Sequence, residues 1–190
     1  MVKKIAISGN IASGKSQVER ILKQRGYTVY DSDDIAHDVL DSLTEFYGYD
    51  VFTDGKIDRN KLGNLVFSNQ ELRKKLELIV HPLVKKRIIE LFDKHSNEKY
   101  IFISVPLLFE AGFDSIFDKV IFVSVSKDIQ LKRLMKRNNL SEKEANLRIN
   151  SQIKQEEKIE KADFVIDNNL TIDNLDEQIS NILNQLVSVG

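Results

Sequence analysis

The fold is decided by one short stretch, Gly9-Asn10-Ile11-Ala12-Ser13-Gly14-Lys15-Ser16. It fills every fixed position of the phosphate-binding loop pattern G-x-x-x-x-G-K-[ST]. The apolar run Lys4–Ser8 before it is typical of a buried strand, and Gln17–Lys23 after it has helical spacing. The backbone N–H groups of such a loop, together with a helix N-terminus, form a partly positive anion site. The sequence therefore predicts a strand, a phosphate-binding loop and a helix, in that order.

Two side chains of the loop carry specific chemistry. Lys15 is expected to reach the β- and γ-phosphates of a nucleotide, and the hydroxyl of Ser16 to hold Mg²⁺. The stretch from Gly9 to Gln17 is accordingly interpreted as an ATP-binding site. The alternative is a glycine-rich turn that only caps an ordinary helix, and the two flanking segments argue against it.

The composition is that of a globular protein without a strong charge bias. Of the 190 residues, 42% are hydrophobic and 30% are charged, which suits one α/β domain with room for an inserted subdomain. The formal net charge of −1 gives no long-range attraction for nucleic acid or anionic lipid, so neither is expected as a partner. The absence of cysteine excludes disulfides, thiolate metal sites and cysteine nucleophiles.

The same sequence contains neither a long apolar run nor a secretory signal pattern. We therefore expect a cytoplasmic protein that does not enter a membrane. A monomer is the default expectation for its oligomeric state.

Five short apolar segments rich in Val, Ile, Phe or Tyr recur along the chain, each followed by a helical pattern. They are Ile5–Ser8, Thr28–Tyr30, Tyr100–Val105, Val120–Val125 and Phe164–Ile166. Continuous apolar strands separated by helices are typical of a parallel sheet covered on both faces. We expect an α/β fold with a three-layer core around a five-stranded parallel sheet, closed by an amphipathic helix over Thr171–Leu186.

Two stretches depart from this alternation and divide the core into residues 1–34, 98–127 and 162–190. Residues 35–97 show helical spacing and a tight turn at Asp54-Gly55, which predicts an inserted helical subdomain with Pro82 near a helix start. Residues 128–161 alternate basic residues with glutamates, as in a solvated helical hairpin or a basic lid that closes over phosphates. The basic residues are Lys132, Arg133, Lys136, Arg137, Lys143, Arg148, Lys154, Lys158 and Lys161.

Acidic residues narrow the class of phosphate-loop protein. The D-x-x-G and N-K-x-D patterns of GTPases do not occur, and Tyr100–Val105 ends without the acid that many ATPases carry there. Acids instead follow the second strand, in Asp31-Ser32-Asp33-Asp34. Because parallel strands end near the phosphate loop, a carboxylate here can accept the proton of an attacking hydroxyl, as a kinase needs. The alternative is that Ser32 or Asp33 caps the following helix.

Further blocks in the chain resemble the dephospho-coenzyme A kinases, in the order of that family. They are Gly9–Ser16, Tyr30–His37, Asp54–Gly63, Ile79–Val84, Val105–Glu110, Gln130–Arg137, Arg148–Gln152 and Ala162–Asn168. Together they span nearly the whole chain and are far more specific than the loop alone. The resemblance implies a core like that of the nucleoside monophosphate kinases, with a helical acceptor subdomain at about 35–97 and a helical lid at about 128–161.

The resemblance also implies a reaction and its residues. The family moves the γ-phosphoryl group of ATP onto the ribose 3′-hydroxyl of dephospho-coenzyme A, the last step of coenzyme A synthesis. By matching position, Asp33 is the general base, and Lys15 and Arg137 assist transfer. The acceptor site would comprise Asp33, His81, Pro106, Leu107 and Glu110. The nucleotide would also be contacted by Arg133, Arg137 and Arg148.

Elementary chemistry leaves some of these roles open. A planar guanidinium such as that of Arg137 binds phosphate oxygens bidentately, better than a lysine does. A lone histidine such as His81 is as readily structural as functional. Glu110 can face Mg²⁺-bound water, the acceptor or a lid arginine.

Two departures from the family pattern are visible. Asn10 stands where the family usually has a second glycine, and asparagine tolerates left-handed backbone angles better than most residues. The segment between Asp41 and Tyr47-Gly48 is shorter than in the family by roughly ten residues, a tolerable change for a surface loop. Two other functions stay open: a nucleoside or nucleoside monophosphate kinase of this architecture, and a nucleotide-gated regulator that binds ATP and a protein partner.

Overall fold

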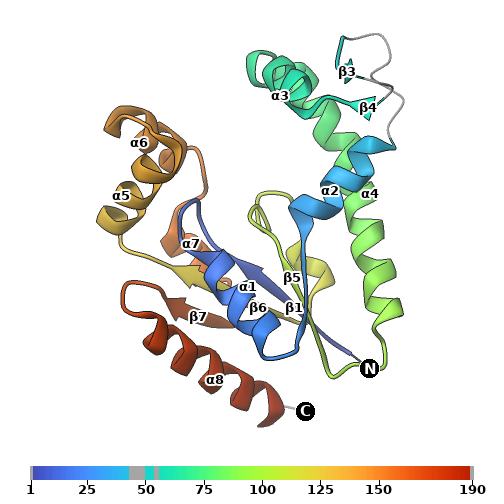
Figure 1. Cartoon of the computed structure of the whole chain (residues 1–190). Coiled ribbons are helices and arrows are strands. Elements are labelled where there is room, and N and C mark those ends of the chain that lie inside the picture. Colours follow the sequence, from blue (N-terminus) through green and yellow to red (C-terminus); the bar gives the residue numbers. More distant parts are fainter. Residues whose placement is uncertain (1, 43–49, 54–55, 189–190) are drawn as a thin grey trace. The chain divides into compact units, whose positions relative to one another are not determined.

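The computed structural model describes residues 2–42, 50–53 and 56–188, which fall into two compact units (Figure 1). The core unit comprises residues 1–30 and 95–190, and the helical unit comprises residues 31–94. The phosphate-binding loop and the whole lid segment, residues 128–161, belong to the core unit.

The core unit is built on a five-stranded sheet with the order β2-β5-β1-β6-β7. Its strands are β1 (Lys3–Ser8), β2 (Thr28–Asp31), β5 (Tyr100–Ser104), β6 (Lys119–Ser124) and β7 (Phe164–Asp167). The central strand β1 pairs in parallel with β5, where Ile7 faces Ser104, and with β6, where Ile7 faces Ile121. Every residue of β5 is buried, as the apolar run from Tyr100 to Ile103 predicts, and the polar Ser104 at its end is buried as well. The predicted five-stranded parallel sheet is confirmed.

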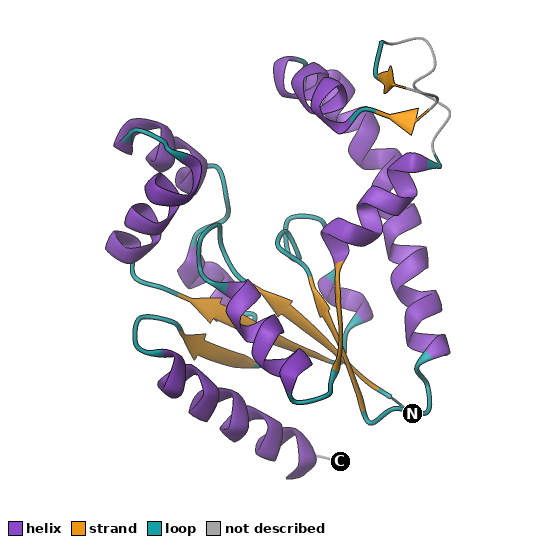
Figure 2. Ribbon diagram, in the orientation of Figure 1, coloured by secondary structure: helices purple, strands orange, loops and turns teal. Residues whose placement is uncertain are grey.

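Helices α1 and α8 pack against each other on one face of this sheet (Figure 2). The helices of the core unit are α1 (Lys15–Gln24), α5 (Lys127–Asn138), α6 (Glu142–Asn150), α7 (Gln155–Ile159) and α8 (Ile172–Ser188), with a 3₁₀ turn at Asp114–Ile116. The apolar faces of α1 and α8 meet the strands in one core, in which Val18, Ile21 and Ile179 are buried. The predicted C-terminal amphipathic helix is confirmed by α8.

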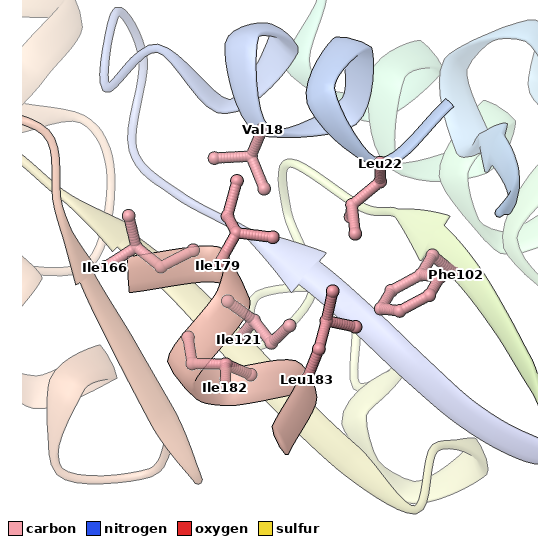
Figure 3. A pocket seen from close by; sticks show the side chains of 8 residues that line it. All are labelled: Val18, Leu22, Phe102, Ile121, Ile166, Ile179, Ile182 and Leu183. Carbon is pink, nitrogen blue, oxygen red and sulfur yellow. The ribbon is translucent and has the colours of Figure 1, made fainter. Parts of the chain in front are cut away.

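A small cavity of about 10 Å³ lies in this core (Figure 3). Its lining consists of Val18, Leu22, Phe102, Ile121, Ile166, Ile179, Ile182 and Leu183. All eight side chains are apolar, so a water molecule would find no hydrogen-bond partner there. The cavity is therefore a packing gap between α1, α8 and the sheet rather than a ligand site.

In its described residues, 31–42, 50–53 and 56–94, the helical unit has three helices and a short antiparallel strand pair. Its elements are α2 (Ser32–Asp41), β3 (Phe52–Thr53), β4 (Lys56–Ile57), α3 (Arg59–Ser68) and α4 (Gln70–Lys94). Two strands of two residues each carry too little periodicity to be predicted from sequence. The turn predicted at Asp54-Gly55 and the pair Tyr47-Gly48 lie outside the described residues.

The expectation that Pro82 lies near a helix start is wrong, because α4 runs without a break from Gln70 to Lys94 with Pro82 inside it. Proline lacks the N–H that would bond the carbonyl of Leu78, four residues earlier. Leu78 is exposed, so solvent is available to that carbonyl. The buried side chains Val80, Val84 and Ile88 anchor the helix on both sides of the proline. Within the described residues no helix is both long enough and apolar enough to cross a bilayer.

Replacement of Ile179 by alanine tests the packing of α8. Ile179 is 2% exposed and already borders the cavity, so Ile179→Ala should lower the free energy of unfolding by about 2–5 kcal/mol. Urea unfolding followed by circular dichroism measures the loss. The matched control is Ile172→Ala on the same helix, where the side chain is 52% exposed and the expected change stays within about 0.5 kcal/mol. Equal effects of the two variants would contradict this account of the core.

Candidate active site

The phosphate-binding loop connects β1 to α1 and has the backbone of an anion site. Ser13 N–H donates to the Asn10 carbonyl at 3.0 Å, and Gly14 precedes the helix with φ of 89°. Within the described residues no side chain caps α1. The first-turn N–H groups of Lys15 and Ser16 have no acceptor inside the helix, and the positive end of the helix dipole lies there. This arrangement suits phosphate oxygens.

Both glycines of the motif are required by close approach of other chain segments. A Cβ atom on Gly9 would lie 2.5 Å from Ser13 Oγ and 2.9 Å from the Val123 carbonyl oxygen. A Cβ atom on Gly14 would collide with the side-chain amide nitrogen of Asn168, and the left-handed φ of Gly14 disfavours any larger residue as well. The ends of β6 and β7 thus restrict the loop to glycine at these two positions.

The expectation that Asn10 is tolerated in the loop because it adopts a left-handed backbone is wrong. The non-glycine residue of the loop with a left-handed backbone is Ala12, at φ of 60°, and Asn10 is not among those with positive φ. Asn10 is buried, and its side-chain amide donates to the Ile153 carbonyl at 3.2 Å. Asn10 therefore connects the phosphate-binding loop to the lid segment by a hydrogen bond.

Further contacts join the lid segment to the loop. Ile11 N–H donates to Gln152 Oε1 at 2.8 Å, and Gln130 Nε2 donates to the Ile11 carbonyl at 2.8 Å. Ile11 and Ala12 also pack against the small apolar core between α5 and α6, which Leu134, Ala145 and Ile149 form. The sequence pattern did not single out Gln130 and Gln152 as loop ligands, because their contacts bridge more than a hundred residues.

The three lid arginines are placed differently. Arg133 donates through Nη1 to the Ser13 carbonyl at 3.3 Å and through Nη2 to the Asn168 carbonyl at 3.1 Å. Arg137 and Arg148 are exposed, and Arg137 Nε donates to the neighbouring Asn138 side chain. Arg133 thus lies against the loop itself. Phosphate binding by all three stays a prediction.

Lys158 is an exception among the lid charges, most of which are solvated as the sequence predicts. Most of the basic residues are exposed, but Lys158 is 0% exposed and its Nζ lies 2.5 Å from Glu110 Oε1. The same Glu110 oxygen accepts from Ile153 N–H at 3.4 Å. A buried ammonium needs a partner of opposite charge, and Glu110 provides it. In this structure Glu110 therefore binds Lys158 of the lid segment. Pro106 and Leu107 lie earlier in the same turn as Glu110.

The first turn of α6 is held by a reciprocal pair of side chains. Ser141 Oγ accepts from Glu144 N–H, and the Glu144 carboxylate accepts from Ser141 Oγ and N–H. These hydrogen bonds, first of all the one from the Ser141 hydroxyl, hold the pKa of Glu144 below its ordinary value of 4.5. Because this pKa is lowered, the ionised Glu144 stabilises the folded state fully above about pH 4.5. This stabilisation is lost as the pH falls through the lowered pKa of Glu144 and the carboxylate becomes protonated.

The loop lysine has partners that the sequence analysis missed. Lys15 Nζ lies 2.9 Å from Glu19 Oε1 and also bonds Ser104 Oγ, at the end of β5. Ser104 Oγ donates to the same Glu19 oxygen at 2.6 Å. The signal for Glu19 was present, because acid and lysine are four residues apart on one helix. No sequence pattern indicated the contact of Ser104 with Lys15, because it depends on the pairing of β5 with β1 in the sheet.

Asp33 and His81 belong to the helical unit, and their approach to the loop stays a prediction. The alternative in which Ser32 or Asp33 caps α2 is wrong: Asp31 is the cap, and its Oδ1 accepts from Asp33 N–H at 2.9 Å. Asp33 is exposed in the first turn of α2, and the side-chain cap of this helix is Asp31. His81 lies partly exposed in the middle of α4.

The chain as a whole is similar to known proteins of one family. The family model for dephospho-CoA kinase matches residues 3–174. A dephospho-CoA kinase from Oceanobacillus iheyensis is 41% identical over 189 residues, which cover 94% of this chain and 95% of that protein. The structure of the dephospho-CoA kinase from Campylobacter jejuni has 32% identity and a TM-score of 0.77, with 98% of each chain covered. TT1252 from Thermus thermophilus has 32% identity and a TM-score of 0.82, with 97% of this chain and 98% of that one covered.

Replacement of Gly14 by alanine tests the loop geometry. The new Cβ meets the Asn168 amide in a left-handed backbone, so the loop must shift and the nucleotide affinity should fall about 10- to 100-fold. Titration calorimetry with an ATP analogue measures this. Gly26→Ala is the matched control, because Gly26 has φ of +83° but no atom within 4 Å of its added Cβ. Wild-type affinity in Gly14→Ala would refute the steric argument.

Proposed function

We infer the activity from one premise, that this chain belongs to the dephospho-CoA kinase family. It phosphorylates dephospho-coenzyme A in the biosynthesis of coenzyme A, with ATP as the phosphoryl donor. The observation that carries this conclusion is the anion site at the start of α1, built from both motif glycines and Lys15, in a chain that matches the family over residues 3–174.

We propose that Mg²⁺ accompanies the ATP. Proteins bind Mg²⁺ through one or two side chains together with substrate phosphates and waters. Ser16 is exposed in the first turn of α1, where its hydroxyl fits this role, and Glu19 lies one turn later. In the described part of the chain no group of three or more His, Asp or Glu side chains could hold a metal ion alone. When bound, the ion would neutralise charge on the β- and γ-phosphates.

The residues of the core unit support phosphoryl transfer by position and charge. Lys15 would neutralise the β- and γ-phosphates, which is a large part of catalysis in this reaction class. Arg137 and Arg148 present exposed guanidinium groups on the lid, and Arg133 is already bound beside the loop. Closure of the lid over bound substrates would exclude water and limit ATP hydrolysis.

We propose Asp33 as the general base. Its carboxylate would accept the proton of the ribose 3′-hydroxyl while that oxygen forms a bond to the γ-phosphorus and the bond from phosphorus to ADP breaks. The exposure of Asp33 and the capping of α2 by Asp31 support this role.

His81, Pro106 and Leu107 are retained as proposed contacts of the acceptor. For Glu110 the ion pair with Lys158 favours a role in holding the lid segment over a direct acceptor contact.

Small molecules are the proposed partners, and the proposed working form is a monomer in the cytoplasm. Nucleic acid and membrane binding form no part of the proposal, because the net charge of −1 offers no attraction for either.

Acceptor specificity tests the proposed reaction. ADP release, followed in a coupled assay, should be fast with dephospho-coenzyme A and slow with adenosine, with AMP or without acceptor. Lys15→Ala should abolish most of this turnover, since it removes a charge that the transition state needs. Faster turnover with adenosine or AMP would favour the nucleoside kinase alternative, and slow turnover with all acceptors would favour the nucleotide-gated regulator.

Replacement of Asp33 by asparagine tests the proposed base. Asp33→Asn should lower kcat by about 10²–10⁴, the usual range for loss of a general base, while the ATP affinity remains unchanged. Steady-state kinetics and nucleotide titration separate the two effects. Asp38→Asn, at another exposed position of α2, is the control and should behave as wild type. If Asp33→Asn turns over like the parent protein, the base lies elsewhere.

A further inference from the structure

The end of strand β5 lacks the acidic residue that many phosphate-loop enzymes carry there. In phosphate-loop enzymes, Mg²⁺ is commonly held by the loop Ser or Thr and by an acidic residue from a strand end beside the loop. Here β5 is the neighbour of β1, and it ends in Ser104, followed by Val105 and Pro106. No carboxylate is therefore supplied from that strand end.

The structure brings a carboxylate to this place from another element. Glu19, on α1, accepts a hydrogen bond from Ser104 Oγ at 2.6 Å. Glu19 is 8% exposed and Ser104 is fully buried, so the contact is shielded from bulk solvent. The Glu19 carboxylate thus lies at the carboxyl end of β5, although α1 provides it.

Helix geometry puts this carboxylate beside the phosphate-binding groups. Lys15, Ser16 and Glu19 are spaced by three and four residues, so they share one side of α1. Lys15 Nζ is 2.9 Å from Glu19 Oε1, the oxygen that Ser104 also contacts. Both of these contacts are made by Oε1, and within the described residues the second oxygen, Oε2, accepts no hydrogen bond. One oxygen orients the side chain, and the other is available to a ligand.

We propose that Glu19 supplies, from helix α1, the carboxylate that binds Mg²⁺ together with Ser16. Ser104 is a positioning residue that fixes the orientation of Glu19 by its hydrogen bond. This inference rests on the proposed use of Mg²⁺ with ATP.

The charge balance of the site favours this role over a purely structural ion pair. A buried carboxylate next to a triphosphate is repelled unless a cation lies between the two. Lys15 is one such cation, but its proposed task is to contact the phosphates. A divalent ion held by Glu19 and Ser16 would supply the positive charge that offsets the repulsion between this carboxylate and the phosphates.

Metal affinity, rather than turnover, tests the proposal. Mn²⁺ replaces Mg²⁺ at oxygen sites, and the free ion is counted by electron paramagnetic resonance. Glu19→Gln, which keeps the shape of the side chain, should weaken Mn²⁺ binding to the protein–ADP complex about 10- to 100-fold. ADP binding without metal should stay the same or tighten. Glu77→Gln, which breaks the exposed i,i+4 pair with Arg73, is the matched control and should leave the Mn²⁺ affinity unchanged.

A double variant that moves the carboxylate from position 19 to position 104 distinguishes metal binding by Glu19 from a purely structural role of Glu19. Glu19→Ala should weaken Mn²⁺ binding, and addition of Ser104→Asp should restore most of it, because the carboxylate then comes from the strand end. Circular dichroism and thermal unfolding check that each variant is folded. Glu19→Gln provides the decisive measurement if the double variant does not fold.

The Mn²⁺ measurements distinguish an error in the role of Glu19 from an error in the proposed Mg²⁺ cofactor. Unchanged Mn²⁺ affinity in Glu19→Gln, or failure of a folded double variant to recover affinity, overturns the role of Glu19 while the kinase function stands. Absence of Mn²⁺ binding to the wild-type protein–ADP complex, with activity in the presence of EDTA, removes the proposed Mg²⁺ cofactor itself.

Discussion

The site depends on one steric constraint, the close approach of the ends of β6 and β7 to the phosphate-binding loop. Val123 and Asn168 come so near that positions 9 and 14 have no room for a side chain. This contact sets the path of the backbone from β1 into α1, and with it the direction of the first-turn N–H groups of the helix. The geometry of the phosphate-binding loop therefore depends on the ends of β1, β6 and β7 and on the start of α1, and not only on the eight residues of the motif.

A second constraint is the compensation of charge around that loop. The buried lid lysine, Lys158, is balanced by Glu110, and the loop lysine, Lys15, by Glu19. Each acid comes from an element other than the strand end where a metal-binding acid is commonly found. Hydrogen bonds from Gln130, Gln152 and Arg133 to the loop backbone join the lid segment to the same network. The phosphate-binding loop and the lid segment are thus joined by direct hydrogen bonds.

The local order of strands and helices was predictable, because apolar periodicity reports burial on one face or on both. All five strands of the sheet and the C-terminal helix agree with their predicted segments to within a few residues. Errors arose where the local rule competes with tertiary packing. Pro82 is a helix-start residue by statistics, yet buried neighbours on both sides keep it inside α4. Asn10 is a left-handed residue by propensity, yet its amide serves a long-range hydrogen bond.

Taken alone, the sequence determined the phosphate-binding loop, the class of fold and the family, since these depend on residue types at short, regular spacings. It also predicted Lys15 as a cation that contacts the phosphates, because the motif has a lysine at this fixed position. Only the tertiary structure decided the contact of that lysine with Ser104 and the burial of Lys158. These depend on contacts between residues 48 to 89 positions apart, such as Lys15 with Ser104 and Glu110 with Lys158. The packing of the sheet and the lid sets such distances, and residue spacing along the chain carries no trace of them.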